Sequence, residues 1–245
     1  MSYLEIRVPQ KFTNPDGLIV VPRLDEGLVA EWSADTLDGG DGASVTTWSS
    51  SGELPLIADQ RVGNGTYPTL EANTINGHHA VAFNGNQGIR AVGDIVPEGG
   101  DVTIAATFRT DHQSVGYILD TDQADGSGRS VFVLTDGHIF RSLASTGSAR
   151  LSSGVAPRVG QWVSFVARFS GTTGRMIGTP MSSEVVATDI PPASMADICF
   201  GTEYRGYSRF TGAIASVMIY DRHLSDVEAS ALLDVMSTRY GIPRV

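Results

Sequence analysis

The chain has 245 residues, of which 41% are hydrophobic and 18% charged, and its formal net charge at pH 7 is −10. This composition is typical of a globular protein, and the length suits one large β-sandwich or two small domains. The acidic balance argues against binding to nucleic acid, which requires basic patches, and against adsorption to an anionic membrane. No apolar run approaches the ~20 residues that a membrane-spanning helix needs.

Residues 1–26 differ from the rest of the chain. They contain three prolines and the only lysine, and Asp16-Gly17 lies between two apolar segments. An Asp-Gly pair in this setting is typical of a hairpin turn, whereas the prolines argue against a central strand. We interpret the segment either as an edge hairpin of the main domain or as an extended arm that docks onto a neighbouring subunit. The start of the chain lacks a basic segment followed by an apolar run, so we expect no signal peptide.

From residue 27 to residue 245 the sequence predicts one domain built from short strands. Apolar or alternating runs lie between turn residues at 28–32, 45–48, 80–83, 102–109, 117–119, 130–134, 138–140, 163–170, 184–188 and 197–200. Some ten short strands with almost no helix favour an all-β fold, an antiparallel two-sheet jelly-roll sandwich.

The last part of the chain predicts a strand followed by one short C-terminal helix. The stretch 213–220 is apolar at nearly every position, as expected for a strand covered on both faces. Ser225 and Glu228 have the spacing of a capping box, and Gly241 suits a left-handed helix end. The apolar stripe of this helix is predicted to comprise Val227, Ala231, Leu232, Val235, Met236 and Tyr240.

The single cysteine and the three tryptophans are predicted to be structural. Cys199 has no second cysteine with which to form an intrachain disulfide, and its apolar neighbours favour a buried, inert thiol. Trp32, Trp48 and Trp162 lie in or beside predicted strands and are assigned to the core.

Several segments together resemble a known family. They are Gly27-Leu-Val-Ala-Glu-Trp32, Ala80-Val-Ala-Phe-Asn-Gly85, Gly160-Gln-Trp-Val-Ser-Phe-Val-Ala167, and residues 210–225 with the helix that follows them. Over roughly residues 27–242 the chain resembles the concanavalin A-like jelly roll of lectins and glucanases, in its laminin G-like branch. One departure is Arg175-Met-Ile-Gly-Thr-Pro, where members usually have a Tyr-Val-Asp-Gly turn, so we expect an altered rim near this hairpin.

The resemblance implies two packed antiparallel sheets, with ligands on a concave face or at the rim loops. Such domains serve as glycan-binding or adhesion modules, as parts of secreted enzymes, and as structural modules of bacteriophage particles. We expect neither a signal peptide nor an intrachain disulfide, and residues 1–26 suit a docking arm. These three features favour a module of a bacteriophage particle. We therefore expect a non-enzymatic virion structural or decoration protein on the capsid surface or the tail. It would be made in the host cytoplasm and would contact other virion proteins through residues 1–26, within a homo-oligomer.

The alternative function is a lectin-like adhesion module that binds carbohydrate with the help of calcium and reaches the extracellular space by another route. Asp120, Asp122 and Asp125 form the densest cluster of carboxylates. Calcium takes six to eight oxygen ligands, and this loop could supply three of them. Laminin G-like domains often bind calcium at a rim loop, so the resemblance implies that the loop of Asp120, Asp122 and Asp125 could bind calcium. A solvated turn is the other interpretation.

The loop 203–209 is the second candidate site. Tyr204 and Tyr207 combine an apolar ring with a polar tip, and Arg205 and Arg209 carry planar hydrogen-bond donors. These residue types suit stacking against sugars and anchoring of protein partners. The other interpretation is that the tyrosines cover the edge of the sandwich.

Enzymatic activity is not expected. Glycoside hydrolysis needs two carboxylates across the scissile bond. Laminarinase-type relatives supply them from one strand written Glu-x-Asp-x-Glu, a string that this sequence lacks, as it lacks the Gly-x-Ser-x-Gly of a serine hydrolase. A hydrolase on this fold is the remote alternative.

Overall fold

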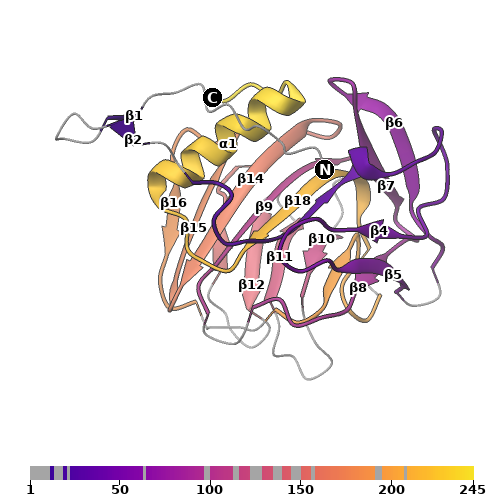
Figure 1. Cartoon of the computed structure of the whole chain (residues 1–245), viewed down its shortest axis with the longest axis horizontal. Coiled ribbons are helices and arrows are strands. Elements are labelled where there is room, and N and C mark those ends of the chain that lie inside the picture. The colour runs from indigo at the N-terminus through magenta and orange to yellow at the C-terminus, as the bar shows by residue number, and fades with distance from the viewer. Residues whose placement is uncertain are drawn as a thin grey trace.

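Two large β-sheets pack face to face in the computed structural model, and one helix lies across the outer face of the first sheet (Figure 1). The structure describes residues 12–13, 19–20, 23–62, 65–96, 100–112, 116–121, 129–134, 140–144, 150–155, 158–190, 195–206 and 209–245. The expected antiparallel sandwich with one C-terminal helix is confirmed.

The sheet that carries the helix is called the helix-side sheet. Its strands follow the order β16 (Val185–Ala187), β15 (Thr173–Gly178), β14 (Trp162–Ser170), β9 (Val102–Thr110), β18 (Thr211–Tyr220), β7 (His78–Asn84) and β6 (Thr69–Ile75). Strand β3 (Leu28–Ser33) also pairs with β18. All of these pairings are antiparallel.

The second sheet is called the opposite sheet. Its strands follow the order β13 (Arg150–Ser152), β12 (Phe140–Ala144), β11 (Arg129–Leu134), β10 (Gly116–Asp120), β17 (Ile198–Phe200), β8 (Ile89–Ala91), β5 (Ile57–Arg61) and β4 (Trp48–Ser49). Strands β4 and β6 are therefore the last strands of their sheets.

The core between the sheets is centred on two tryptophans and a phenylalanine. Trp32 and Trp48 are fully buried, and the ring centroid of each lies 5.1 Å from that of Phe200. Their indole N–H groups remain satisfied, because Trp32 donates to the carbonyl of Trp48 and Trp48 donates to the carbonyl of Ser33, both at 3.1 Å. The predicted core position of these two residues and the burial of Cys199 are confirmed.

The helix α1 (Asp226–Tyr240) begins and ends where the sequence predicts. Ser225 and Glu228 form the capping box, and Gly241 ends the helix with a φ of 64°. The apolar stripe is shifted from the predicted one: Val227 is 37% exposed, whereas Leu233 is buried with Leu232 against the sheet. The helical period shows that one face of α1 is apolar, but it does not fix the orientation of that face. The orientation depends on how α1 packs against β9, β14 and β18.

A buried arginine fixes the start of α1 to the helix-side sheet. Arg168 of β14 is 1% exposed and donates to the carbonyl of Leu224 (2.7 Å) and to the carboxylate of Asp226 (2.8 Å). It also donates to Glu184, whose second oxygen accepts from Arg175 at 2.9 Å. This arrangement places two carboxylates around one desolvated guanidinium.

The N-terminal strands β1 (Phe12–Thr13) and β2 (Ile19–Val20) pair only with each other among the described residues and form a separate two-stranded sheet (Figure 1). Residues 23–26 belong to the sandwich: Leu24 is 3% exposed beneath α1, and the carbonyls of Arg23 and Glu26 accept from Arg222. The described part of the chain contains no helix long and apolar enough to cross a membrane.

Candidate ligand-binding groove

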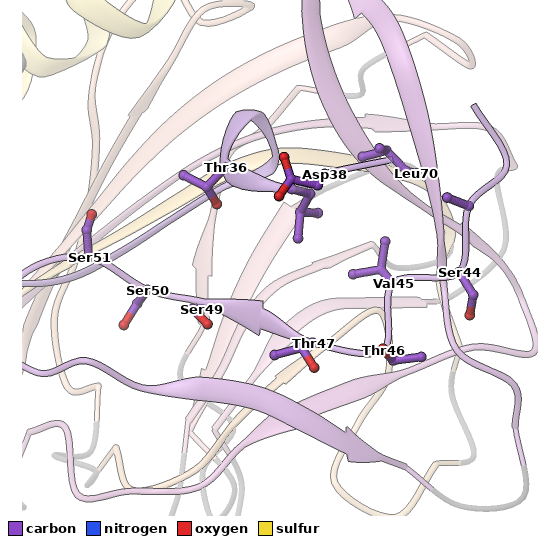
Figure 2. A pocket seen from close by; sticks show the side chains of 12 residues that line it. Thr36, Asp38, Ser44, Val45, Thr46, Thr47, Ser49, Ser50, Ser51 and Leu70 are labelled. Atoms are coloured by element: carbon purple, nitrogen blue, oxygen red, sulfur yellow. The ribbon is translucent and has the colours of Figure 1, made fainter. Parts of the chain in front are cut away.

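A groove of about 450 Å³ opens at the edge of the sandwich where both sheets end (Figure 2). Figure 2 shows Thr36, Asp38 and Leu70 along one wall and the segment from Ser44 to Ser51 along the other. The first wall follows the short 3₁₀-helix η1 (Ala34–Thr36), and the second contains the edge strand β4. The groove is a feature of the rim, not of a sheet face.

Both walls are held by the surrounding fold. Ser33 caps η1, its carbonyl accepts from the Thr36 hydroxyl at 2.8 Å, and the same carbonyl accepts from the buried indole of Trp48. The second wall is hydrogen-bonded at its start to β6 and to the residue before it, since Leu70 donates to the carbonyl of Ala43 and Val45 donates to that of Pro68, both at 2.8 Å. The groove is therefore pre-formed.

The lining of the groove is rich in exposed hydroxyl groups. Within the described part of the chain, the hydroxyls of Ser44, Thr46, Thr47 and Ser49 and the carboxylate of Asp38 have no hydrogen-bond partner. Each hydroxyl can donate one hydrogen bond and accept two, and the carboxylate accepts only. Such a set can satisfy both the donors and the acceptors of a ligand that carries several hydroxyl groups.

The groove does not present the pair of acids that glycoside hydrolysis requires. Among its described lining residues Asp38 is the single carboxylate. Hydrolysis with either stereochemical outcome uses two carboxyl groups facing each other across the bond. The described lining suits binding of a polyhydroxylated ligand.

A charged cluster beside the groove fixes η1 to the end of α1. Burial raises the pKa of Asp35, but hydrogen bonds from the His79 amide, Arg239 and His78 outweigh it, so the pKa lies below the usual value. Burial raises the pKa of Glu31 above the usual value, because the compensating attraction to Arg239, 3.6 Å away, is weaker. The ionised Asp35 thus holds the groove wall against two other elements.

The structure brings the two predicted site loops into contact. Asp120 lies at the end of β10, is fully buried, and accepts a hydrogen bond of 2.8 Å from the backbone N–H of Tyr204. Asp122 and Asp125 lie outside the described residues. Among the residues that the structure describes, no three His, Cys, Asp or Glu side chains form a group that could hold a metal ion. The calcium site therefore stays a prediction.

Two residues of the predicted aromatic loop, Tyr204 and Arg209, already contact other side chains of the protein. The guanidinium of Arg90 lies 5.2 Å from the ring centroid of Tyr204. Arg209 donates to the carbonyl of Gly206 at 2.8 Å and also bonds Asn86. Arg205 is exposed, and Tyr207 lies outside the described residues. A ligand-binding role for this loop stays a prediction.

The groove lies outside both of the sites predicted from the sequence. A usable signal was present, because six of the eight residues from 44 to 51 are serine or threonine. Only the folded chain shows that Asp38 and Leu70 complete the lining.

Residues 83–230 match a protein-family model described as the concanavalin A-like lectin/glucanases superfamily. Among curated proteins, none matches the chain. Several solved structures share its fold.

One of these is domain 4 of AbnA, an extracellular GH43 arabinanase from Geobacillus stearothermophilus, solved in complex with arabinotriose. It has 17% identity and a TM-score of 0.64, and the match covers 86% of this chain and 98% of that one. A GH54 α-L-arabinofuranosidase has 12% identity and a TM-score of 0.59, over 87% of this chain and 63% of that one. The Trypanosoma rangeli sialidase has 14% identity and a TM-score of 0.59, over 93% of this chain and 35% of that one. The chain thus spans only part of the two latter enzymes.

Proposed function

Because the chain belongs to the concanavalin A-like lectin/glucanase superfamily, we propose that it is a non-catalytic module that binds a neutral oligosaccharide in the hydroxyl-lined groove. The observation that carries this proposal is the set of unpartnered hydroxyls around Asp38 on two pre-formed walls. The arabinanase domain solved with arabinotriose, a protein of similar fold and nearly equal extent, supports carbohydrate as the ligand class. The single carboxylate among the described lining residues supports binding over hydrolysis.

If the oligosaccharide binds in the groove, removing the hydroxyl groups of the lining should lower its affinity. In the triple variant Asp38→Asn, Thr46→Val and Thr47→Val, the shape of the lining is kept while hydrogen-bonding groups are lost. At roughly 1 kcal/mol for each lost hydrogen bond, we expect affinity for arabinotriose or another oligosaccharide found on a glycan array to fall at least about tenfold. Isothermal titration calorimetry measures this loss, and the melting temperature should change little because these side chains are exposed.

The control is Thr238→Val, which removes an exposed hydroxyl on α1, outside the groove lining, and should leave affinity unchanged. Unaltered binding by the triple variant would contradict the groove assignment.

We expect binding to survive EDTA, since one carboxylate is too few for a calcium site. Loss of binding in EDTA would instead favour the loop of Asp120, Asp122 and Asp125. Release of reducing sugar from the bound oligosaccharide would support the hydrolase alternative.

We further propose that the module works on a bacteriophage virion, where the N-terminal segment joins it to neighbouring subunits. The supporting observation is that β1 and β2 pair with each other and, among the described strands, with neither large sheet. An element of this kind is free to add to another chain.

This role predicts that deletion of residues 1–22 leaves a folded sandwich that no longer forms its homo-oligomer. The deletion stops before Arg23 because residues 23–26 pack against the sandwich. Light scattering coupled to size exclusion would give the mass of each form, and the melting temperature would report folding. A truncated chain with the oligomeric mass of the full chain would contradict the docking role.

A further inference from the structure

A second pocket, of about 430 Å³, lies on the outer side of the helix-side sheet and shares no lining residue with the groove. It is bounded by the turn between β6 and β7, the end of α1, and the start of β14. We propose that this pocket is a second carbohydrate subsite, in which a neutral sugar ring stacks on Trp162. The ligand class rests on the proposed function, whereas the location and the residues are independent of the groove.

Trp162 differs from the other two tryptophans. The sequence assigns all three to the core, but Trp162 is only partly buried and packs against a small hydrophobic cluster that includes Tyr240 and Ile242, so the assignment holds only in part for this residue. Its neighbour Val163 is fully buried between the sheets, so the alternation along β14 turns Trp162 toward the outer face. An aromatic ring at the surface of a pocket offers a flat apolar platform.

The platform is held rigid from one side. The guanidinium carbon of Arg109 lies 5.1 Å from the centroid of the Trp162 ring. Arg109 is itself fixed by Asp111, at 2.6 Å, and by Glu71, at 3.2 Å. The two carboxylates more than offset the positive charge of Arg109, so this arginine orients the indole without making the pocket attractive to an anion. Such preorganisation lowers the entropic cost of binding.

Polar groups beside the ring can bind the hydroxyls of a sugar. Within the described part of the chain, the Trp162 indole N–H and the side-chain N–H₂ of Gln161 have no hydrogen-bond partner. The Gln161 oxygen accepts from the backbone N–H of Arg158 at 3.2 Å, which directs the free amide N–H₂. On the opposite side Asn76 is fixed by donating to the carbonyl of Arg239 at 2.9 Å.

The absence of charged side chains from the described lining favours neutral ligands over charged ones. None of its described lining residues is charged: beside Trp162, Gln161 and Asn76 they comprise threonine, tyrosine, glycine, isoleucine and proline. A sugar acid or a phosphorylated ligand would find no cationic partner in the lining. An aromatic plane flanked by amide and indole donors complements a neutral sugar, which has an apolar ring face and hydroxyls at its edges.

The tryptophan content makes a direct test possible. Trp32 and Trp48 are fully buried, so in the folded protein only Trp162 is accessible to N-bromosuccinimide or to a dissolved quencher. We expect saturating arabinotriose, cellotriose or maltotriose to slow oxidation of Trp162 at least about threefold for whichever sugar binds. The full-length chain is used, and calorimetry is run in parallel on the triple groove variant to isolate the second subsite.

Two variants separate a loss of sugar binding at this subsite from a loss of folding. Trp162→Leu keeps an apolar side chain but removes the platform, and we expect affinity at the second subsite to fall about tenfold or more. Gln161→Ala changes an exposed side chain, so the fold is retained, and we expect a loss of about fivefold from one hydrogen bond. Thr172→Ala, an exposed position outside the lining, is the control.

Protection of Trp162 by a neutral sugar, weakened in Gln161→Ala, supports the proposal. Binding by calorimetry without protection of Trp162 would overturn the subsite and leave the groove as the only site. Protection by an apolar peptide and by none of the sugars would also overturn it, in favour of a protein partner. The absence of any heat or protection with all three sugars and an array-selected ligand would overturn both the subsite and the proposed function.

Discussion

Replacing Gly201 by alanine is expected to lower the free energy of unfolding by about 4 kcal/mol, a sum of backbone strain and overpacking. Gly201 follows β17 with a φ of +76°, a conformation that alanine adopts only with strain. An alanine Cβ would also lie 2.1 Å from the ring of Phe83. Phe83 is 3% exposed and its ring centroid is 6.1 Å from that of Phe210, so the ring has little room to move.

Gly160 provides a matched control for this substitution. Its φ of +78° is nearly the same, but a Cβ there would have no neighbour within 4 Å. Gly160→Ala should therefore cost only the backbone strain, about 1 kcal/mol. Urea unfolding monitored by tryptophan fluorescence gives both values. Equal losses for the two variants would contradict the packing of Gly201 against Phe83.

Replacing Glu184 by glutamine is expected to lower the free energy of unfolding by about 3 kcal/mol. The change removes the charge of the partner that lies against the buried Arg168, which is 1% exposed, and leaves the guanidinium desolvated with less compensation. Asp226, the other carboxylate, is 74% exposed in its side chain and cannot replace the loss.

Two further variants test this explanation. Asp226→Asn should cost less than about 1 kcal/mol, because an exposed ion pair is screened by solvent. Adding Arg168→Met to Glu184→Gln should recover much of the lost stability, since a buried ion pair can often be replaced by apolar groups. If the double variant were less stable than Glu184→Gln alone, Arg168 would stabilise the start of α1 chiefly through the Leu224 carbonyl.

The sequence predicts the fold best where local and tertiary signals agree. The strand before α1 is apolar on both faces because one face meets the core and the other meets the helix, and a capping box then marks the helix start. Strands β5 and β6 were not predicted. Both contain polar residues, such as Asp59 and Glu71, that interrupt the apolar pattern, and β5 pairs with β8, some 30 residues further along the chain. Strands with several polar residues carry little hydrophobic periodicity of their own.

The candidate site was less predictable than the fold. The hydroxyl-rich run is local, but its partner Leu70 comes from another strand, so the groove exists only after the sheets have formed. Contact between Asp120 and Tyr204 joins two loops 84 residues apart, which no local pattern encodes. The position of Trp162 on the outer face of its sheet could not be predicted, because hydrophobicity alone does not decide which face of an alternating strand a residue occupies.

Residues 42–45, at one end of the groove, also cover the free edge of β6, the last strand of the helix-side sheet. Gly42 donates to the carbonyl of Leu70, and Leu70 donates to that of Ala43, so part of the free backbone of β6 is already hydrogen-bonded. An uncovered edge strand is a template for intermolecular β-pairing and aggregation. Sequence changes that loosen the backbone of residues 42–45 would therefore affect more than ligand affinity: they would expose β6 to edge-to-edge association. Engineering of new specificity in this groove is safest at the exposed side chains of Thr46, Thr47 and Ser49, which leave that covering and the buried Trp48 in place.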